Sequence, residues 1–152
     1  MFNTEKTAVG LYKLYCEEKG IHFDNIEIGR NEYGKPYLIG TDIHISISHT
    51  DSLTVVAFSP YNIGIDCEKV SRTVKNPLNI IERAFSPAEC KYVLSKSGDL
   101  QSRFIEIWVK KEAYVKYVGV GIKAIKSTDT FSLKGIFNRF QAFEHIIYTY
   151  NE

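Results

Sequence analysis

The chain has 152 residues, of which 44% are hydrophobic and 24% are charged, as expected for one soluble globular domain with its own core. Nineteen basic and eighteen acidic side chains give a formal net charge of +1, which argues against indiscriminate nucleic-acid binding. The polar N-terminus is unlike a signal peptide and no apolar run reaches the length of a membrane span, which predicts a cytoplasmic protein without a membrane partner. Three widely spaced cysteines, Cys16, Cys67 and Cys90, indicate reduced structural thiols.

The first elements expected along the chain are a helix and a short strand. Residues 4–19 have apolar positions at helical spacing, and Gly20 is suited to end the helix. Ile26 and Ile28 alternate with polar neighbours, as in a short strand. Tyr-Gly-Lys-Pro at residues 33–36 predicts a turn.

Three strands are predicted between residues 43 and 68. Isoleucines at 43, 45 and 47 alternate with polar residues, which predicts a half-buried strand whose polar face looks outward or into a cleft, followed by a turn at residues 48–52. Residues 53–58 and 62–68 predict two more strands of an antiparallel meander. In the last strand, side-chain alternation places Asp66 and Glu68 on one face, roughly 6.5 Å apart along the strand, close enough to share a cation.

Helices are predicted after a polar loop at residues 71–75. Asn-Pro at residues 76–77 favours a short helix through Arg83. Ser-Pro-Ala-Glu at residues 86–89 combines a capping box with proline at the first helical position, which predicts a helix over residues 87–95. Ser-Gly-Asp at residues 97–99 is expected to terminate it. Two further strands are predicted near the C-terminus, at residues 130–133 and 142–150.

A long helix is predicted over residues 101–118, ended by Gly119 or Gly121. Three of its side chains are spaced four apart and therefore share one face: Trp108, Glu112 and Lys116. A glutamate and a lysine at this spacing often form only a solvated face. The other interpretation is a binding site, because buried charge is costly unless it is paired or bound.

Three carboxylates in two predicted elements would suit a hard divalent cation: Asp66, Glu68 and Glu112. Lys116 would place an ammonium beside that cation, an arrangement that neutralises a diphosphate. Lys35 and His49, both on predicted turns, are candidates for further phosphate contacts. Ordinary alternatives stay open, because Asp-x-Glu at a strand end can be a solvated edge and a lone histidine can serve as a capping residue.

Four blocks of the sequence resemble, in identity and spacing, the signature blocks of the 4′-phosphopantetheinyl transferase superfamily. They are Gly-Lys-Pro-Tyr-Leu at residues 34–38, Ile-Ser-Ile-Ser-His-Thr at 45–50, Gly-Ile-Asp-Cys-Glu at 64–68 and Trp-Val-Lys-Lys-Glu-Ala-Tyr-Val-Lys at 108–116. Because the first two blocks precede Gly-Ile-Asp in one chain, the resemblance is to the larger, surfactin-synthetase-activating type. It implies a single α+β domain of two pseudo-repeated halves, residues 1–61 and 62–152, each an antiparallel sheet packed with a long helix.

The resemblance also implies a reaction and its residues. The phosphopantetheine arm of coenzyme A would be transferred to a serine of an apo acyl or peptidyl carrier protein, releasing adenosine 3′,5′-bisphosphate. At the matching positions, Mg²⁺, or Mn²⁺ in its place, would be bound by Asp66, Glu68 and Glu112. Coenzyme A would be bound by Lys35, Ser48, His49 and Lys116. Catalysis would fall to Asp66, Glu112 as the base toward serine, and Lys116 at the leaving group.

Compared with this family pattern, the chain looks shortened at both ends, so the first half is expected to be incomplete. Unpaired sheet edges would then favour a monomer or a weak dimer joined through an exposed edge. The carrier protein is expected to dock beside residues 71–95, near Arg72, Lys75 and Arg83. Two alternatives remain: a divergent, non-catalytic member that binds coenzyme A or a carrier protein, and a metal-dependent phosphodiesterase that uses the same carboxylates.

Overall fold

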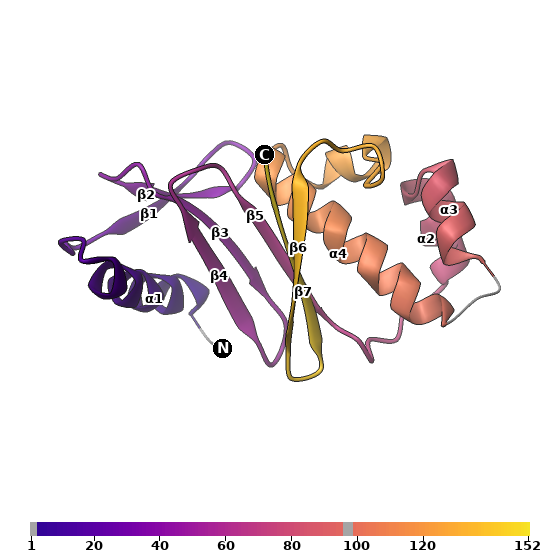
Figure 1. Ribbon diagram of the computed structural model, residues 1–152, viewed down its shortest axis with the longest axis horizontal. Helices are drawn as coiled ribbons and strands as arrows, with labels where there is room; N and C mark the ends of the chain where they lie inside the picture. Colours follow the sequence, from indigo (N-terminus) through magenta and orange to yellow (C-terminus); the bar gives the residue numbers. More distant parts are fainter. Residues whose placement is uncertain (1–2, 96–98) are drawn as a thin grey trace.

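The computed structural model describes residues 3–95 and 99–152. Its first element is helix α1 (Thr4–Lys19), shown in Figure 1. The side chain of Asn3 caps this helix by accepting hydrogen bonds from the amides of Glu5 and Lys6. Gly20 ends it with a left-handed backbone conformation, φ 65°. The helix predicted for residues 4–19 is therefore confirmed at both ends.

Two antiparallel strand pairs follow α1, as Figure 1 shows: β1 (Glu27–Arg30) with β2 (Pro36–Ile39), and β3 (His44–His49) with β4 (Thr54–Ser59). They bury a first apolar cluster against α1, composed of Ala8, Tyr12, Cys16, Leu38 and Ile45. Strand β2 is not among the predicted strands, because the proline at its start also suits the preceding turn.

The predicted turn at residues 48–52 is wrong at its start. Ser48 and His49 continue β3, because they pair with Val55 and Thr54 of β4, and the turn begins at Thr50. Of the two predicted orientations for the polar face of β3, the one into a cleft is confirmed, since Ser46 and Ser48 are buried and line a cleft. Both serines face the strand that follows β4 in the chain.

That strand, β5 (Gly64–Lys69), does not extend a meander. It pairs antiparallel with β7 (His145–Asn151), which in turn pairs with β6 (Ile136–Ala142). Its contacts to β3 run through side chains: the hydroxyl oxygens of Ser46 and Ser48 accept hydrogen bonds from the amides of Ile65 and Cys67, at 3.0 and 3.3 Å. The two strands run in the same direction along this seam.

Three helices follow β5: α2 (Pro77–Ala84), α3 (Pro87–Val93) and α4 (Leu100–Val118). The capping box of α3 is formed by Ser86 and Glu89 as predicted, and α4 ends at Gly119, whose φ is 74°. The helix predicted over residues 87–95 ends two residues earlier, at Val93, and its predicted terminating residues 97–99 lie largely outside the described residues. No described helix is both long and apolar enough to cross a membrane.

The strand predicted at residues 130–133 is wrong. After the 3₁₀ helix η1 (Ile122–Ser127) the chain forms a turn there, because the amide and hydroxyl of Thr130 both donate to the buried carboxylate of Glu89, each at 2.8 Å. Strand β6 begins six residues later. The strand predicted at residues 142–150 is confirmed as β7, although a turn at residues 143–144 precedes it.

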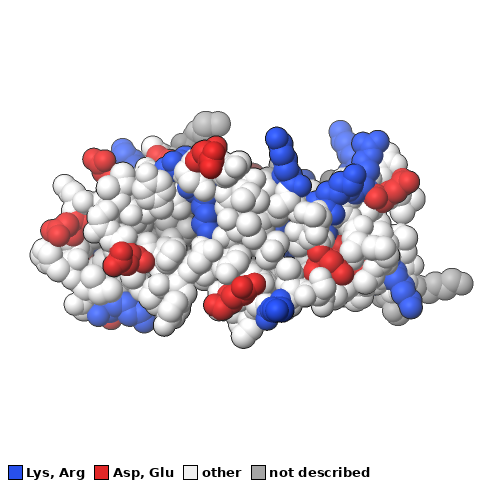
Figure 2. Space-filling model, turned by 90° about the horizontal axis from the view of Figure 1, so that it is seen from above, with Lys and Arg blue, Asp and Glu red and all other residues white. Residues whose placement is uncertain are grey.

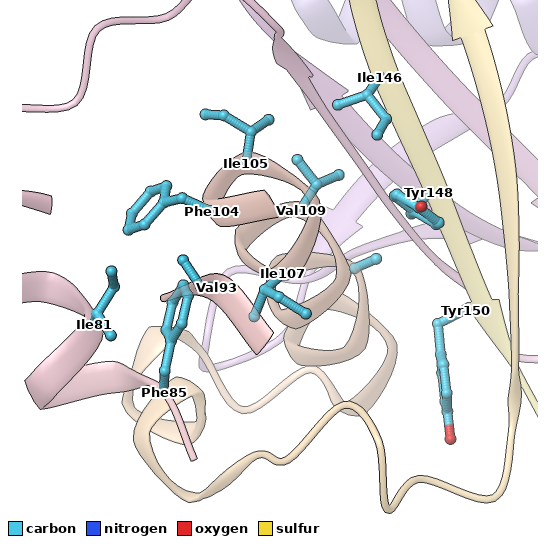
Figure 3. Close-up of a cluster of buried hydrophobic side chains, with 11 residues drawn as sticks. Ile81, Phe85, Val93, Phe104, Ile105, Ile107, Val109, Ile146, Tyr148 and Tyr150 are labelled. Carbon is cyan, nitrogen blue, oxygen red and sulfur yellow. The ribbon is translucent and has the colours of Figure 1, made fainter. Parts of the chain in front are cut away.

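The larger apolar core surrounds α4. Figure 3 shows α4 side chains directed toward Ile81 and Phe85 on one side, and toward the β7 side chains on the other. Strand β5 lies directly against α4 at Gly64, where an added Cβ would lie 1.9 Å from the carbonyl oxygen of Ala113. The described helices and antiparallel sheets confirm the α+β class, and the three cysteines are free, as predicted.

Candidate active site

A cleft of about 570 Å³ contains every predicted site residue. They reach it from four segments: Lys35 from the β1–β2 turn, Ser48 and His49 from β3, Asp66 and Glu68 from β5, and Glu112 and Lys116 from α4. The carboxylate-bearing face of β5 points toward α4, because Gly64 on that same face lets the strand approach the helix. The fold thus brings together residues that the sequence separates widely.

Asp66 lies at the centre of this arrangement and is buried. Its Oδ1 accepts hydrogen bonds from Ser48 Oγ and from Lys116 Nζ, both at 2.7 Å. Burial raises the pKa of Asp66 above its ordinary value, although Lys116 and Ser48 act in the opposite direction. Lys116 and Ser48 therefore fix the orientation of this carboxyl.

Glu68 is paired with a residue that sequence analysis did not assign to the site. Its Oε2 accepts a hydrogen bond from Arg72 Nη1, and its Oε1 accepts one from the Lys69 amide at 3.0 Å. Arg72 was predicted to face a carrier protein, but it lines the cleft. Its spacing of four from Glu68 in a loop was the only available signal for this pairing.

Glu112 differs from the other two carboxyls. No described side chain donates a hydrogen bond to it, and its carboxyl faces the same cleft. Burial, followed by the nearby charge of Asp66, raises the pKa of Glu112 to about 7, against the opposing effects of Lys116 and Arg72. Glu112 is therefore the carboxyl with the least compensated negative charge.

The donor chemistry of these carboxyls fits a hard cation such as Mg²⁺, because all three offer oxygen ligands to one cleft. The described residues do not, however, contain a ready-made group of three His, Cys, Asp or Glu side chains around one metal position. Asp66 and Glu68 are instead engaged with Lys116 and Arg72. The assignment of these carboxyls as metal ligands stays a prediction.

The predicted phosphate contacts differ in their environments. His49 is exposed at the cleft. Lys35 is directed toward the end of α4, where its Nζ donates to Asn62 Oδ1 and to the Tyr117 carbonyl, both at 2.6 Å. Burial lowers the pKa of Lys35. No sequence pattern indicated this contact between the β1–β2 turn and α4.

Two further residues line the cleft. Trp108 stacks on Phe104 of the same helix with 6.1 Å between ring centroids, packs against the larger core and forms part of the cleft wall. Arg30, which no sequence pattern singled out, is held by Glu5 of α1 through a hydrogen bond of 2.9 Å. The cleft therefore combines three carboxyls with several cationic side chains, which is suited to a phosphorylated ligand bound together with a metal.

Comparison with known proteins agrees with this description. The family model of the 4′-phosphopantetheinyl transferase superfamily matches residues 62–148, which contain β5, α4 and the start of β7. The 4′-phosphopantetheinyl transferase gsp of Aneurinibacillus migulanus is 40% identical over 111 residues, which cover 72% of this chain and 45% of that protein. The 4′-phosphopantetheinyl transferase of Bacillus subtilis is 35% identical over 117 residues, covering 76% of this chain and 50% of that protein.

A more distant relative comes from Rattus norvegicus. Its L-aminoadipate-semialdehyde dehydrogenase-phosphopantetheinyl transferase is 29% identical over 123 residues, covering 72% of this chain and 40% of that protein. The chain thus spans about half the length of the curated relatives it matches. Because the family model covers more than half of the chain, the protein belongs to the 4′-phosphopantetheinyl transferase superfamily.

Proposed function

We propose that this protein transfers the 4′-phosphopantetheine arm of coenzyme A to a serine hydroxyl of an apo acyl or peptidyl carrier protein and releases adenosine 3′,5′-bisphosphate. One observation supports this proposal above the others. Within the region that matches the family, the carboxyls of Asp66, Glu68 and Glu112 face the same cleft as the Lys116 ammonium. That combination is suited to a metal-bound diphosphate.

In this proposal, Asp66, Glu68 and Glu112 would hold Mg²⁺, which would withdraw negative charge from the diphosphate of coenzyme A. Mn²⁺ would substitute for it, since it prefers the same oxygen donors. Lys35, Ser48 and His49 contact the phosphates of the nucleotide. These positions line one cleft with the carboxyls, so one ligand can reach all of them.

The protein's own residues then move one proton and stabilise one leaving group. Glu112 accepts the proton of the serine hydroxyl, whose oxygen forms the new bond to phosphorus. The bond from that phosphorus to the bridging oxygen breaks, and Lys116 donates hydrogen bonds to the departing phosphate of adenosine 3′,5′-bisphosphate. Asp66 orients Lys116 before the ligand binds, through their 2.7 Å contact.

A single assay tests this proposal. The protein is incubated with coenzyme A, Mg²⁺ and an apo carrier protein, and the carrier is then weighed by mass spectrometry. We expect the carrier to gain one phosphopantetheinyl group, and to gain none when Mg²⁺ is chelated.

Two other outcomes would contradict the proposal and identify the alternative. Binding of coenzyme A in calorimetry without any transfer would indicate a non-catalytic member of the family. Cleavage of coenzyme A in the absence of a carrier protein would indicate a metal-dependent phosphodiesterase.

A further inference from the structure

The C-terminal end of α4 is held by side chains from outside the helix. The last carbonyls of any α-helix have no intrahelical partner. In α4, the carbonyl of Tyr117 accepts hydrogen bonds from Lys35 Nζ at 2.6 Å and from Asn62 Nδ2 at 2.9 Å. The carbonyl of Gly119 accepts one from Asn31 Nδ2 at 3.1 Å. Two segments distant in sequence therefore meet at this helix end.

These contacts form a connected cluster. Asn62 joins it twice, because its Oδ1 also accepts a hydrogen bond from Lys35 Nζ at 2.6 Å. The ammonium of Lys35 lies 5.9 Å from the centroid of the Tyr117 ring. Its positive charge is placed favourably, since the C-terminus of a helix carries partial negative charge.

The local backbone is shaped to admit this cluster. Gly119 has a φ of 74°, which favours glycine, and it ends the helix. A Cβ at Gly119 would also lie 2.6 Å from Cδ of Lys35. Glycine at this position thus allows the lysine stem to pass and reach the Tyr117 carbonyl.

We propose that Asn31, Lys35 and Asn62 are positioning residues that cap α4 and thereby fix Lys116 in the cleft. Lys116 directly precedes Tyr117, whose carbonyl receives two of these contacts. An ammonium has three N–H groups. Two of those on Lys35 serve the cap, which leaves the third for a phosphate oxygen in the cleft that Lys35 lines. The inference rests on the proposed function in so far as Lys116 acts on the phosphates.

Asn62 offers the cleanest test, because it does not line the cleft and cannot be a ligand contact there. Asn31 is less selective, since its Oδ1 also accepts hydrogen bonds from the amides of Tyr33 and Lys35 in its own turn. A matched control is Asn138→Ala, which removes an exposed asparagine of β6 whose one side-chain contact is a 3.4 Å hydrogen bond to Asn151. The test compares Asn62→Ala with this control, and uses Asn31→Ala as a second cap variant.

The first measurement is amide hydrogen exchange of residues 115–119 without ligand. Loss of the hydrogen bonds of Asn62 should increase exchange at these amides about tenfold, while the control leaves it unchanged. Exchange that rises equally throughout the chain, or not at all at these residues, would overturn the proposal. A general loss of stability is thereby separated from loss of the cap.

The second measurement is kinetic. If the cap positions Lys116, Asn62→Ala should lower kcat about tenfold, whereas the Kd of coenzyme A should change less than about twofold. An unchanged kcat, with faster exchange at residues 115–119, would overturn the positioning role. A wild-type protein without transfer activity would contradict the proposed function instead. In that case the NMR chemical shift of the Lys116 ¹³Cε tests the cap without any activity. A change of this shift in Asn62→Ala but not in the control would support the positioning role, and no change in Asn62→Ala would overturn it.

Discussion

At the scale of single residues, the three carboxyls of the cleft are unequally compensated. Asp66 is bonded to Lys116 and Glu68 to Arg72, whereas no described side chain donates to Glu112. Burial and the charge of Asp66 consequently raise the pKa of Glu112 to about 7. The ionised form of Glu112 destabilises the metal-free fold, and a ligand that neutralises it would stabilise the protein.

We predict opposite effects of Glu112→Gln on activity and stability. Transfer should be abolished, because the proposed base and metal ligand is lost. A carboxyl whose pKa is higher in the folded than in the unfolded protein destabilises the fold increasingly as the pH rises from 4.5 to about 7. Above that pH the full loss of folding free energy remains. The variant should therefore be more stable than the wild type at pH 8 in the presence of a chelator, by roughly 2–3 kcal/mol. Urea unfolding at pH 4 and pH 8 measures this difference, which should vanish at pH 4.

Glu106 provides the control for this prediction because its pKa is shifted the other way. Burial would raise the pKa of Glu106, but hydrogen bonds from Lys110, Tyr92 and Tyr148 outweigh it and lower the pKa. Ionised Glu106 stabilises the fold at pH values above the pKa that it has in the unfolded protein. This stabilisation is lost as the pH falls through the lower pKa that Glu106 has in the folded protein. Glu106→Gln should therefore destabilise the protein at pH 8. If both variants shifted stability in the same direction, the assignment of these pKa shifts would be wrong.

At the scale of elements, the position of β5 on α4 depends on one glycine. A Cβ at Gly64 would lie 1.9 Å from the Ala113 carbonyl oxygen and 2.5 Å from the Tyr117 amide nitrogen, and backbone atoms within a helix cannot move aside easily. Gly64→Ala should therefore displace β5, destabilise the fold by about 3 kcal/mol and weaken coenzyme A binding. Chemical unfolding and calorimetry measure these effects.

The control for Gly64 is Gly10, in the middle of α1. An added Cβ there meets no other atom within 4 Å. Because alanine favours helices over glycine, Gly10→Ala should stabilise the protein by about 0.5–1 kcal/mol. A Gly64→Ala variant as stable as Gly10→Ala would show that β5 does not rest directly on α4.

A buried ion pair joins α3 to α4 behind the cleft. Lys111 Nζ lies 2.8 Å from Glu89 Oε2, and both side chains are fully buried. We predict that Lys111→Met destabilises the protein by about 3–5 kcal/mol, because it leaves Glu89 buried without its counterion. Adding Glu89→Gln should restore part of the loss. Thermal and urea unfolding of the two single variants and the double variant measure the coupling, and simple additivity would contradict the pairing.

At the scale of the whole molecule, the near-zero net charge hides an uneven surface. On the face shown in Figure 2, the densest group of Lys and Arg side chains lies on the half of the molecule that holds α2, α3 and α4, although others lie on the α1 half, and acidic side chains are scattered along its length. Lys75 and Arg83 are exposed beside and within α2 in that half of the molecule. This distribution supports the prediction that an acidic carrier protein docks there.

Charge reversal tests that docking prediction. Lys75→Glu combined with Arg83→Glu should raise the KM for the carrier protein about tenfold, and leave the Kd of coenzyme A unchanged, since neither residue lines the cleft. Lys13→Glu, an exposed change on α1, serves as the control for altered net charge. Steady-state transfer assays at low salt measure both effects. An unaltered KM in the double variant would remove α2 from the docking surface.

Local signals in the sequence explain which parts of the fold could be predicted. Helices α1 and α4 end at glycines and α3 begins with a capping box, so each carries its own boundary. Strand β6 lacks such a signal, because Ile136 and Phe140 are exposed and most of the strand shows no alternation. The predicted division at residues 61 and 62, and self-association through a sheet edge, stay predictions.

The candidate site shows the same limit. The four sequence blocks supplied the residues that meet in the cleft. They contain no sign that Arg72 bonds to Glu68, or that Asn62 reaches the end of α4, because both side chains lie outside the blocks and each contact depends on the folded course of the chain. Strand β5 likewise carried no signal for its partner, which lies about 80 residues later in the chain.

That partner strand has a consequence for the time at which the site can form during synthesis. Proteins emerge from the ribosome N-terminal end first, and domains fold as units. Asp66 and Glu68 lie opposite Tyr148 and Ile146 of β7, so β5 has its main-chain partner only after β7 has been made. A nascent chain that already contains all four signature blocks would still lack an ordered carboxylate face. Translation of β7 therefore decides when the carboxylate face of β5 can first be ordered.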